Sequence, residues 1–297
     1  MRDWSFELKH FGVGLVVLAA IFWGVSGGLA GILMERDWDP LVISFYRGAV
    51  GLVCLFIWML FRTRYYSYGS LRKMLFWSLL SGIGVTGNFS FYFVSISHSG
   101  VAIASTLMYT APIFVFIISF ILKMEKATTF KVVAMLIVMG GIGLLTGVYQ
   151  NGLGQLNILG IVTGLLSGLS YAIFIFGFNY ALKYGEPPAI LSTALLAFTL
   201  ILLPFIDRGQ AVSVLFSEDI FMFIVLGLIG AGISFFFYVK GLRNTLPSVA
   251  SVVAMVEPVT ASLFGVLVLG QFLNPTQIAG MVIILITITI LTTKKTE

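Results

Sequence analysis

Two charged side chains, Arg47 and Glu257, fall inside long apolar runs of the sequence. A charged residue in the middle of a membrane-spanning helix costs about 2.5–3.5 kcal/mol, so each of the two needs an explanation. Glu257 lies about ten residues from both ends of its run, roughly 15 Å deep if the run is helical. A carboxylate at that depth could anchor a cation or carry a proton, and the Arg47 guanidinium could bind a carboxylate.

Both charges also have structural explanations. Glu257 could form a structural ion pair or favour the start of a helix. Arg47 lies about six residues, roughly 9 Å, from one end of its run. Its long side chain could therefore extend to the interface, or hold the loop carboxylates of Asp37 and Asp39.

Further polar and aromatic side chains fall well inside apolar runs, where an amide, indole or phenol needs a hydrogen-bond partner or a cavity. They are Asn88, Trp23, Tyr92, Tyr109, Tyr171 and Tyr238. Aromatic faces beside a carboxylate suit an organic cation, and beside Arg47 they suit an aromatic or aliphatic amino acid. Ordinary helix packing is the alternative for any single tyrosine. We predict that these six residues, with Arg47 and Glu257, bind or couple a substrate.

Catalytic and metal-binding patterns are not found in the sequence. Gly82, Gly84 and Gly87 fit the pattern G-x-G-x-x-G, but no strand precedes them, so they predict close helix packing instead. There is no Walker-type loop, and two histidines and one cysteine give no metal site. An enzyme would need a second carboxylate or a nucleophile–base pair near Glu257, and a channel would need rings of like polar residues. We expect no catalytic residue, no metal and no cofactor.

The elements that must position these side chains follow from the composition. Hydrophobic residues make up 59% of the 297 residues and charged residues only 10%, too few to cover the surface of a soluble protein. Ten apolar runs are each long enough to span a bilayer as a helix. They lie near 11–33, 41–61, 74–97, 101–122, 129–149, 156–182, 188–206, 219–239, 247–269 and 275–293. The sequence therefore predicts an all-α polytopic membrane protein with ten transmembrane helices.

The distribution of lysine and arginine predicts the orientation. With the N-terminus in the cytoplasm, Arg36 and Arg208 fall on the outer side and Arg47 within a helix. The other Lys and Arg residues fall on the cytoplasmic side. They are Arg2, Lys9, Arg62, Arg64, Arg72, Lys73, Lys123, Lys126, Lys131, Lys183, Lys240, Arg243, Lys294 and Lys295. Both termini are therefore expected in the cytoplasm, and the net charge of +5 reflects topology and not nucleic-acid binding.

An internal repeat divides the chain. At an offset of 146, eight residues match without a gap: Gly84, Phe89, Phe91, Tyr92, Ala104, Ser105, Pro112 and Met135 recur as Gly230, Phe235, Phe237, Tyr238, Ala250, Ser251, Pro258 and Met281. The repeat is five helices long, so the second copy would enter the membrane from the opposite side. We predict two inverted halves, 1–150 and 151–297. Ala111 and Ala194 stand opposite Glu257 and Arg47, so each charge is present in one half only, which favours a role in substrate binding or gating.

Several short motifs resemble one known family. They are Phe22-Trp23-Gly24, Pro40 followed by Arg47, Pro112 with Glu125 beyond it, and Glu257-Pro258. With the five-helix repeat, they are similar to EamA-type members of the drug/metabolite transporter superfamily. That family's second Glu, after a Leu-Gly pair, is Gln271 here. The resemblance implies a ten-helix bundle with a central cavity and efflux of small metabolites, amino acids or drugs.

Together these features predict a secondary active transporter, not an enzyme. We expect a multi-pass protein of the bacterial inner (plasma) membrane, monomeric or homodimeric, that exports small metabolites such as amino acids by alternating access. Coupling to protons at Glu257, or facilitated exchange, would drive it. The alternative is a transporter of organic cations or drugs. Arg47 facing the cavity would favour a carboxylate-bearing substrate, whereas Glu257 alone in the cavity would favour a cation.

Overall fold

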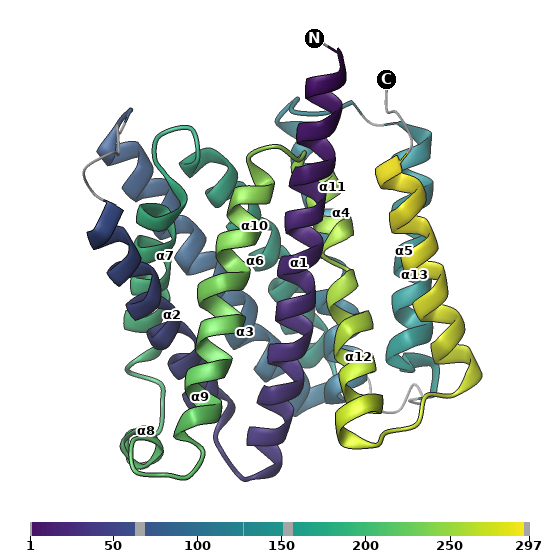
Figure 1. The fold of residues 1–297 in the computed structure, drawn as a ribbon. Coiled ribbons are helices and arrows are strands. Elements are labelled where there is room, and N and C mark those ends of the chain that lie inside the picture. Colours follow the sequence, from purple (N-terminus) through teal and green to yellow (C-terminus); the bar gives the residue numbers. More distant parts are fainter. Residues whose placement is uncertain (1, 63–68, 127, 151–156, 294–297) are drawn as a thin grey trace.

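A computed structural model describes residues 2–62, 69–126, 128–150 and 157–293, and every regular element in these ranges is helical. The helices form one bundle (Figure 1). Their bounds are α1 Arg2–Glu35, α2 Pro40–Arg62, α3 Leu71–Met108, α4 Ala111–Ile121, α5 Thr129–Thr146, α6 Ile158–Ala181, α7 Pro187–Leu202, α8 Arg208–Val214, α9 Ile220–Gly227, α10 Ser234–Leu242, α11 Pro247–Val253, α12 Val256–Leu269 and α13 Pro275–Thr293. A short 3-10 turn, η2, covers Val148–Gln150, and a π-helical turn, η4, covers Leu228–Ile233.

The two ends of the bundle differ. Helix α1 begins and α13 ends at one end, which we call the terminal end (Figure 1). The short helix α8, the α1–α2 connection and the α12–α13 connection lie at the opposite end, which we call the α8 end. Arg64, Lys294 and Lys295, used above to predict the orientation, lie outside the described residues, as does the start of the predicted second half at 151.

Eight helical segments of the described chain are long and apolar enough to cross a membrane. Two of them join shorter elements, α9 with η4 and α10, and α11 with α12. Helices α4 and α7 are apolar but shorter. The protein is therefore an all-α membrane protein, as predicted.

Helix α3 contains a sharp interruption that separates two of the predicted runs. Gly100 has φ 78° and ψ 164°, a conformation that residues with a side chain rarely adopt. It divides α3 into residues 71–99 and 101–108. The predicted runs 74–97 and 101–122 meet at the same point.

The predicted run 101–122 is not one continuous helix. It breaks at Tyr109 and Thr110, before α4, and the run 247–269 breaks between α11 and α12. Pro112 and Pro258 follow these breaks, and a proline has no N–H to continue the hydrogen bonding of the preceding turn. The two parts of the repeat thus share one broken helix, with the breaks within one residue of each other at the offset of 146.

Glycines bring helices into close contact, as the sequence predicted for Gly82, Gly84 and Gly87. A Cβ on Gly82 would lie 2.4 Å from the Ala194 carbonyl oxygen, and one on Gly84 would lie 2.7 Å from the Phe174 nitrogen. The G-x-G-x-x-G pattern therefore packs α3 against α6 and α7.

The α5–α13 contact gives a testable case. A Cβ on Gly280 would lie 2.5 Å from the Gly141 carbonyl oxygen, so Gly280→Leu should force the two helices apart. We expect it to destabilise the fold by about 1–3 kcal/mol, as overpacking does elsewhere. Gly140→Leu is the matched control, because no atom of the residues that the structure describes lies within 4 Å of a Cβ there. Thermal unfolding of both variants in detergent checks this, and equal melting temperatures would contradict it.

Candidate functional site

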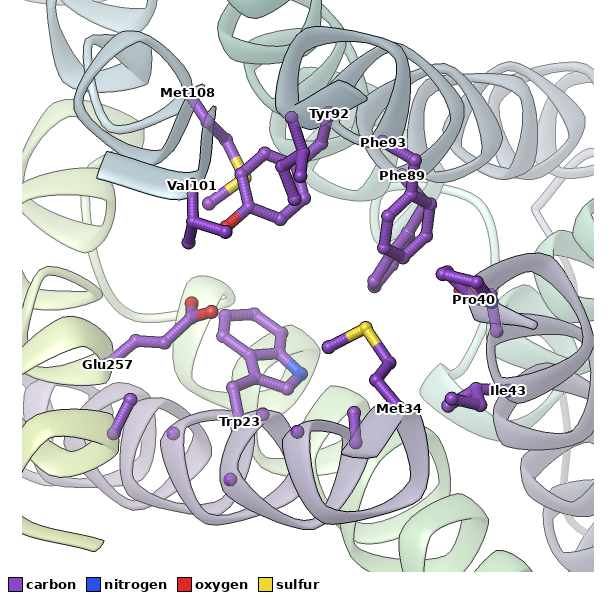
Figure 2. A pocket seen from close by; sticks show the side chains of 18 of the residues that line it. Trp23, Met34, Pro40, Ile43, Phe89, Tyr92, Phe93, Val101, Met108 and Glu257 are labelled. Atoms are coloured by element: carbon purple, nitrogen blue, oxygen red, sulfur yellow. The ribbon is translucent and has the colours of Figure 1, made fainter. Parts of the chain in front are cut away.

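A cavity of about 600 Å³ lies among α1, α2, α3, α6, α10 and α12. Its lining runs from Trp23 and Glu257 in the middle of the bundle to Met34, Pro40 and Gln271 at the α8 end. This volume falls within the range of about 300–1,000 Å³ found for small-molecule sites. Figure 2 shows side chains from several helices facing one central space.

Seven of the eight side chains predicted from the sequence line this cavity. They are Trp23, Arg47, Asn88, Tyr92, Tyr109, Tyr171 and Glu257. The eighth, Tyr238, is not among the lining residues and is fully buried beneath them. The residues selected from the sequence by depth and polarity therefore lie on five different helices and line the same cavity.

Arg47 is held in place by an irregular turn of the opposite half. Its Nε donates a hydrogen bond of 3.0 Å to the carbonyl oxygen of Gly230, in η4. Its guanidinium carbon lies 5.0 Å from the centre of the Phe89 ring. A Cβ on Gly230 would lie 2.8 Å from Nε, so a glycine is needed for this approach. Within the described residues its two terminal nitrogens have no hydrogen-bond partner, and such a pair of nitrogens can bind a carboxylate.

The structure does not support the view that Arg47 serves the loop carboxylates. Asp39 instead accepts the backbone N–H groups of Leu41 and Val42, at 2.8 and 3.1 Å, at the start of α2. The ion pairs of the described chain join Arg36 to Asp219, Lys131 to Glu125 and Arg243 to Glu186. Neither Arg47 nor Glu257 takes part in them.

Glu257 lies in the first turn of α12, just after the break between α11 and α12. No hydrogen bond or ion pair reaches its carboxylate from any of the described residues. The side chain extends into the cavity beside Trp23 (Figure 2). Its position at a helix N-terminus is electrostatically favourable for an anion. Nevertheless, the carboxylate faces the cavity.

Asn88 has partners within the bundle. Its Nδ2 donates to the carbonyl oxygen and to the hydroxyl of Ser167, both at 3.1 Å. The Ser167 hydroxyl donates back to the Asn88 carbonyl oxygen at 2.8 Å. Asn88 therefore ties α3 to α6 where the cavity wall is formed.

Aromatic side chains that the sequence did not single out make up much of the wall. They are Phe89, Phe93, Phe174, Phe235 and Phe264. One signal could have found two of them, because Phe89 and Phe235 are matched residues of the repeat. A residue type that recurs at the same repeat position in both halves, deep in the bundle, is a candidate for the cavity wall even when it is apolar.

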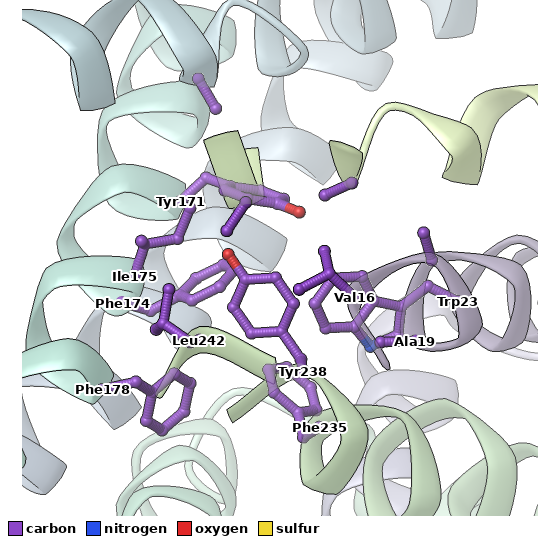
Figure 3. Close-up of a cluster of buried hydrophobic side chains, with 14 of the residues drawn as sticks. Val16, Ala19, Trp23, Tyr171, Phe174, Ile175, Phe178, Phe235, Tyr238 and Leu242 are labelled. Atoms are coloured by element: carbon purple, nitrogen blue, oxygen red, sulfur yellow. The ribbon is translucent and has the colours of Figure 1, made fainter. Parts of the chain in front are cut away.

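The cavity ends in a packed aromatic floor, formed by Trp23, Tyr171, Phe174, Phe235 and Tyr238 (Figure 3). The ring centres of Trp23 and Tyr238 are 4.9 Å apart, and those of Tyr171 and Phe174 are 4.4 Å apart. Three polar atoms in this floor, Trp23 Nε1 and the two tyrosine hydroxyls, are buried with no hydrogen-bond partner among the described residues. Each such atom costs about 1–3 kcal/mol, which a polar ligand or water entering the floor would recover.

A helical bundle with two related halves, and with a charged aromatic cavity reaching one end of the bundle, is the architecture of a membrane transporter. The model of the EamA-like transporter family matches the chain twice, over residues 10–147 and 158–293. The protein belongs to this family, within the drug/metabolite transporter superfamily.

Relatives of known sequence are similar over nearly their whole length. An uncharacterized transporter of Archaeoglobus fulgidus is 27% identical over 94% of this chain and 96% of its own. The uncharacterized transporter YwfM of Bacillus subtilis is 22% identical over 91% of this chain and 90% of its own. A crystal structure with 15% identity superposes with a TM-score of 0.71 over 98% of this chain and 97% of the other, which shows a common fold.

Proposed function

We propose that the protein is a secondary active transporter that exports small metabolites, in particular amino acids, across the bacterial cell membrane. One observation carries this proposal: Arg47 and Glu257 line the same cavity, and neither forms an ion pair in the described chain. A cation and a carboxylate held apart in one small space are complementary to a molecule with both a carboxylate and an ammonium group. The aromatic wall would contact an apolar substrate side chain. Export is the direction that the family resemblance implies.

The transport mechanism that we propose is alternating access between two inverted five-helix halves, 1–150 and 151–297. If Gly100 separates two spans, and if α4 and α7 also cross the bilayer, the chain has ten spans. The position of both terminal helices at one end of the bundle agrees with an even number (Figure 1). The lysine and arginine distribution favours a cytoplasmic position of that end. In this orientation the cavity is open to the outside and the aromatic floor closes it toward the cytoplasm.

A second candidate is a transporter of organic cations. The unpaired carboxylate of Glu257 and the nearby rings of Trp23 and Tyr109 would bind an ammonium group through charge and cation–π contacts. In that case Arg47 would repel the substrate instead of binding it, so the two candidates predict opposite effects of neutralising Arg47.

Counterflow into proteoliposomes separates the candidates. Vesicles are preloaded in parallel with zwitterionic amino acids and with organic cations, and uptake of the matching labelled compound is followed with and without a pH gradient. Saturable amino-acid counterflow supports the first candidate, and cation counterflow supports the second. No counterflow with either class would contradict both substrate assignments.

The Gly230 contact predicts a position-specific effect on substrate binding. In Gly230→Ala the new methyl group would lie 2.8 Å from both Arg47 Nε and the Ser26 side chain. It would displace the Arg47 guanidinium, so we expect KM for a carboxylate-bearing substrate to rise about tenfold, the loss of one charged hydrogen bond. Gly232→Ala is the matched control in the same turn, because its Cβ would meet Cys54 Sγ at an ordinary 3.5 Å. Counterflow kinetics of both variants check this, and equal KM values would contradict it.

A further inference from the structure

Glu125, in the turn after α4, is the centre of a buried polar contact between the two halves. Its carboxylate accepts a hydrogen bond from Lys131 Nζ at 2.7 Å, one from the Ser248 backbone N–H at 3.2 Å, and one from the Ser248 hydroxyl. The side chains of Glu125 and Lys131 are only 3% and 9% exposed. Because Ser248 belongs to α11, these three residues join the first half to the second. We call them the Glu125 latch.

The latch lies at the end of the bundle that is closed. Helix α4 packs directly against α11, with the latch at the ends of both. Among the described residues the cavity reaches the α8 end, and the aromatic floor separates it from the terminal end. Opening at the terminal end by separating α4 from α11 would therefore pull Ser248 away from the Glu125 carboxylate.

The offset of 146 that relates the halves gives each latch residue an equivalent at the α8 end. The three pairs are Glu125 and Gln271, Lys131 and Gln277, and Ser248 and Ala102. The local backbone is alike, because Thr128 and Asn274 are also equivalent and cap α5 and α13 in the same way. The α8 end thus carries two neutral amides and a methyl group where the terminal end carries an ion pair and a hydroxyl.

The interface equivalent to α4–α11 is the one between α12 and residues 101–108, and it is open. Val101 and Met108 line one side of the cavity, whereas Phe264 and Gln271 line the other. Of two related interfaces, the packed one holds the latch and the separated one does not.

The ion pair between Arg36 and Asp219 at the α8 end does not close that end. It joins the end of α1 to the start of α9, which are in contact on one wall of the bundle. The pair is formed while the cavity is open, so it does not substitute for the latch.

We propose that the Glu125 latch holds the protein in the conformation that opens at the α8 end, and that it must separate before the terminal end can open. Separation of the latch removes hydrogen bonds to a charged group, whereas closure of the α8 end gains only neutral contacts. The two conformations therefore differ in free energy even without substrate. The proposal rests on the alternating-access function above. It adds that the Glu125 latch determines which conformation is favoured in the absence of substrate.

Distances between spin labels test it without a substrate. In a background with Cys54→Ala, one labelled pair is Lys126→Cys with Leu246→Cys at the terminal end. The other is His98→Cys with Phe272→Cys at the α8 end. All four positions are exposed. Electron–electron double resonance in lipid nanodiscs then reports opening and closing at each end.

The first variant, Glu125→Gln with Lys131→Gln and Ser248→Ala, gives the terminal end the residues found at the α8 end. It leaves no unpaired buried charge. We expect the ratio of the terminal-open to the terminal-closed population to rise about tenfold, a moderate coupling for an allosteric contact. The distance at the α8 end should shorten in the same molecules.

The second variant transfers the latch, with Gln271→Glu, Gln277→Lys and Ala102→Ser. It leaves the native latch in place, so it does not depend on the folding of the first variant. We expect it to raise the α8-closed population, and the two variants combined should make the terminal-open state dominant. Distance distributions identical to the parent in all variants would overturn the proposal.

Counterflow measured on the same proteins distinguishes the two proposals. Shifted distances without transport of any tested substrate would leave the latch standing and remove the proposed function. Transport with unshifted distances would do the reverse.

Discussion

Alanine in place of Arg47 is expected to abolish counterflow of amino acids. The guanidinium lines the cavity and has its terminal nitrogens available, while Gly230 and Phe89 hold it in position. Without it, a substrate carboxylate would enter a largely apolar cavity with no partner, a loss of about 3–5 kcal/mol for a buried charge left alone. That loss lowers the apparent affinity about a hundredfold or more.

Two variants make the Arg47 result specific. Arg47→Lys keeps the charge but loses the planar fork and the Nε bond to Gly230, so it should retain only part of the activity. Arg208→Ala removes a positive charge at an exposed site on α8 and should behave like the parent. If Arg47→Ala instead speeds the counterflow of organic cations, the second candidate function replaces the first.

The helices could be predicted from the sequence because a bilayer requires long apolar segments to be helical. Long apolar runs can only become helices in lipid, because every backbone polar group must find a partner inside its own segment. Prolines at positions 40, 187, 247 and 275 mark where helices begin. The break at Tyr109 and Thr110 was not predicted, although Pro112 and its repeat partner Pro258 were noticed. The length and hydropathy of an apolar run do not reveal an interruption of the helix in which a single backbone hydrogen bond is lost.

The lining of the cavity could be predicted in part because polar groups are rare at membrane depth. Trp23, Arg47 and Glu257 stood out against apolar neighbours, and all three line the cavity. Phe89 and Gly230 did not stand out. Their roles arise from contacts between helices far apart in the chain, and helices that are apolar on every side carry no periodic signal for the face they present.

Tyr238 shows the limit of reasoning from depth. It was selected for the same reason as Tyr92, its partner in the repeat, yet Tyr92 lines the cavity while Tyr238 lies in the floor. The two residues occupy equivalent positions of the repeat, at the offset of 146. If the halves exchange roles during transport, Tyr238 becomes a cavity residue in the other conformation. In the structure Tyr238 lies outside the cavity lining, and its selection as a substrate-binding or coupling residue stays a prediction.

Glutamine in place of Glu257 is expected to leave counterflow active and to abolish accumulation driven by a pH gradient. Glutamine preserves the size of the side chain and its ability to accept a hydrogen bond from an ammonium group, but it cannot bind or release a proton. For this prediction we propose that the Glu257 carboxylate binds either the substrate ammonium or a proton, and never both at once. Loss of the titrating group removes that exchange and leaves only facilitated movement.

Accumulation ratios in proteoliposomes, compared with counterflow rates in the same vesicles, measure this difference. Glu257→Asp keeps the carboxylate and should keep some pH-driven accumulation, whereas Glu218→Gln, at an exposed site before α9, should match the parent. Undiminished pH-driven accumulation by Glu257→Gln would place coupling at another group. Loss of counterflow as well would mean that the ammonium needs the full negative charge, and Glu257 would then be a substrate anchor first. The two readouts together assign the carboxylate to binding, to coupling or to both, because only coupling requires a proton to leave and return.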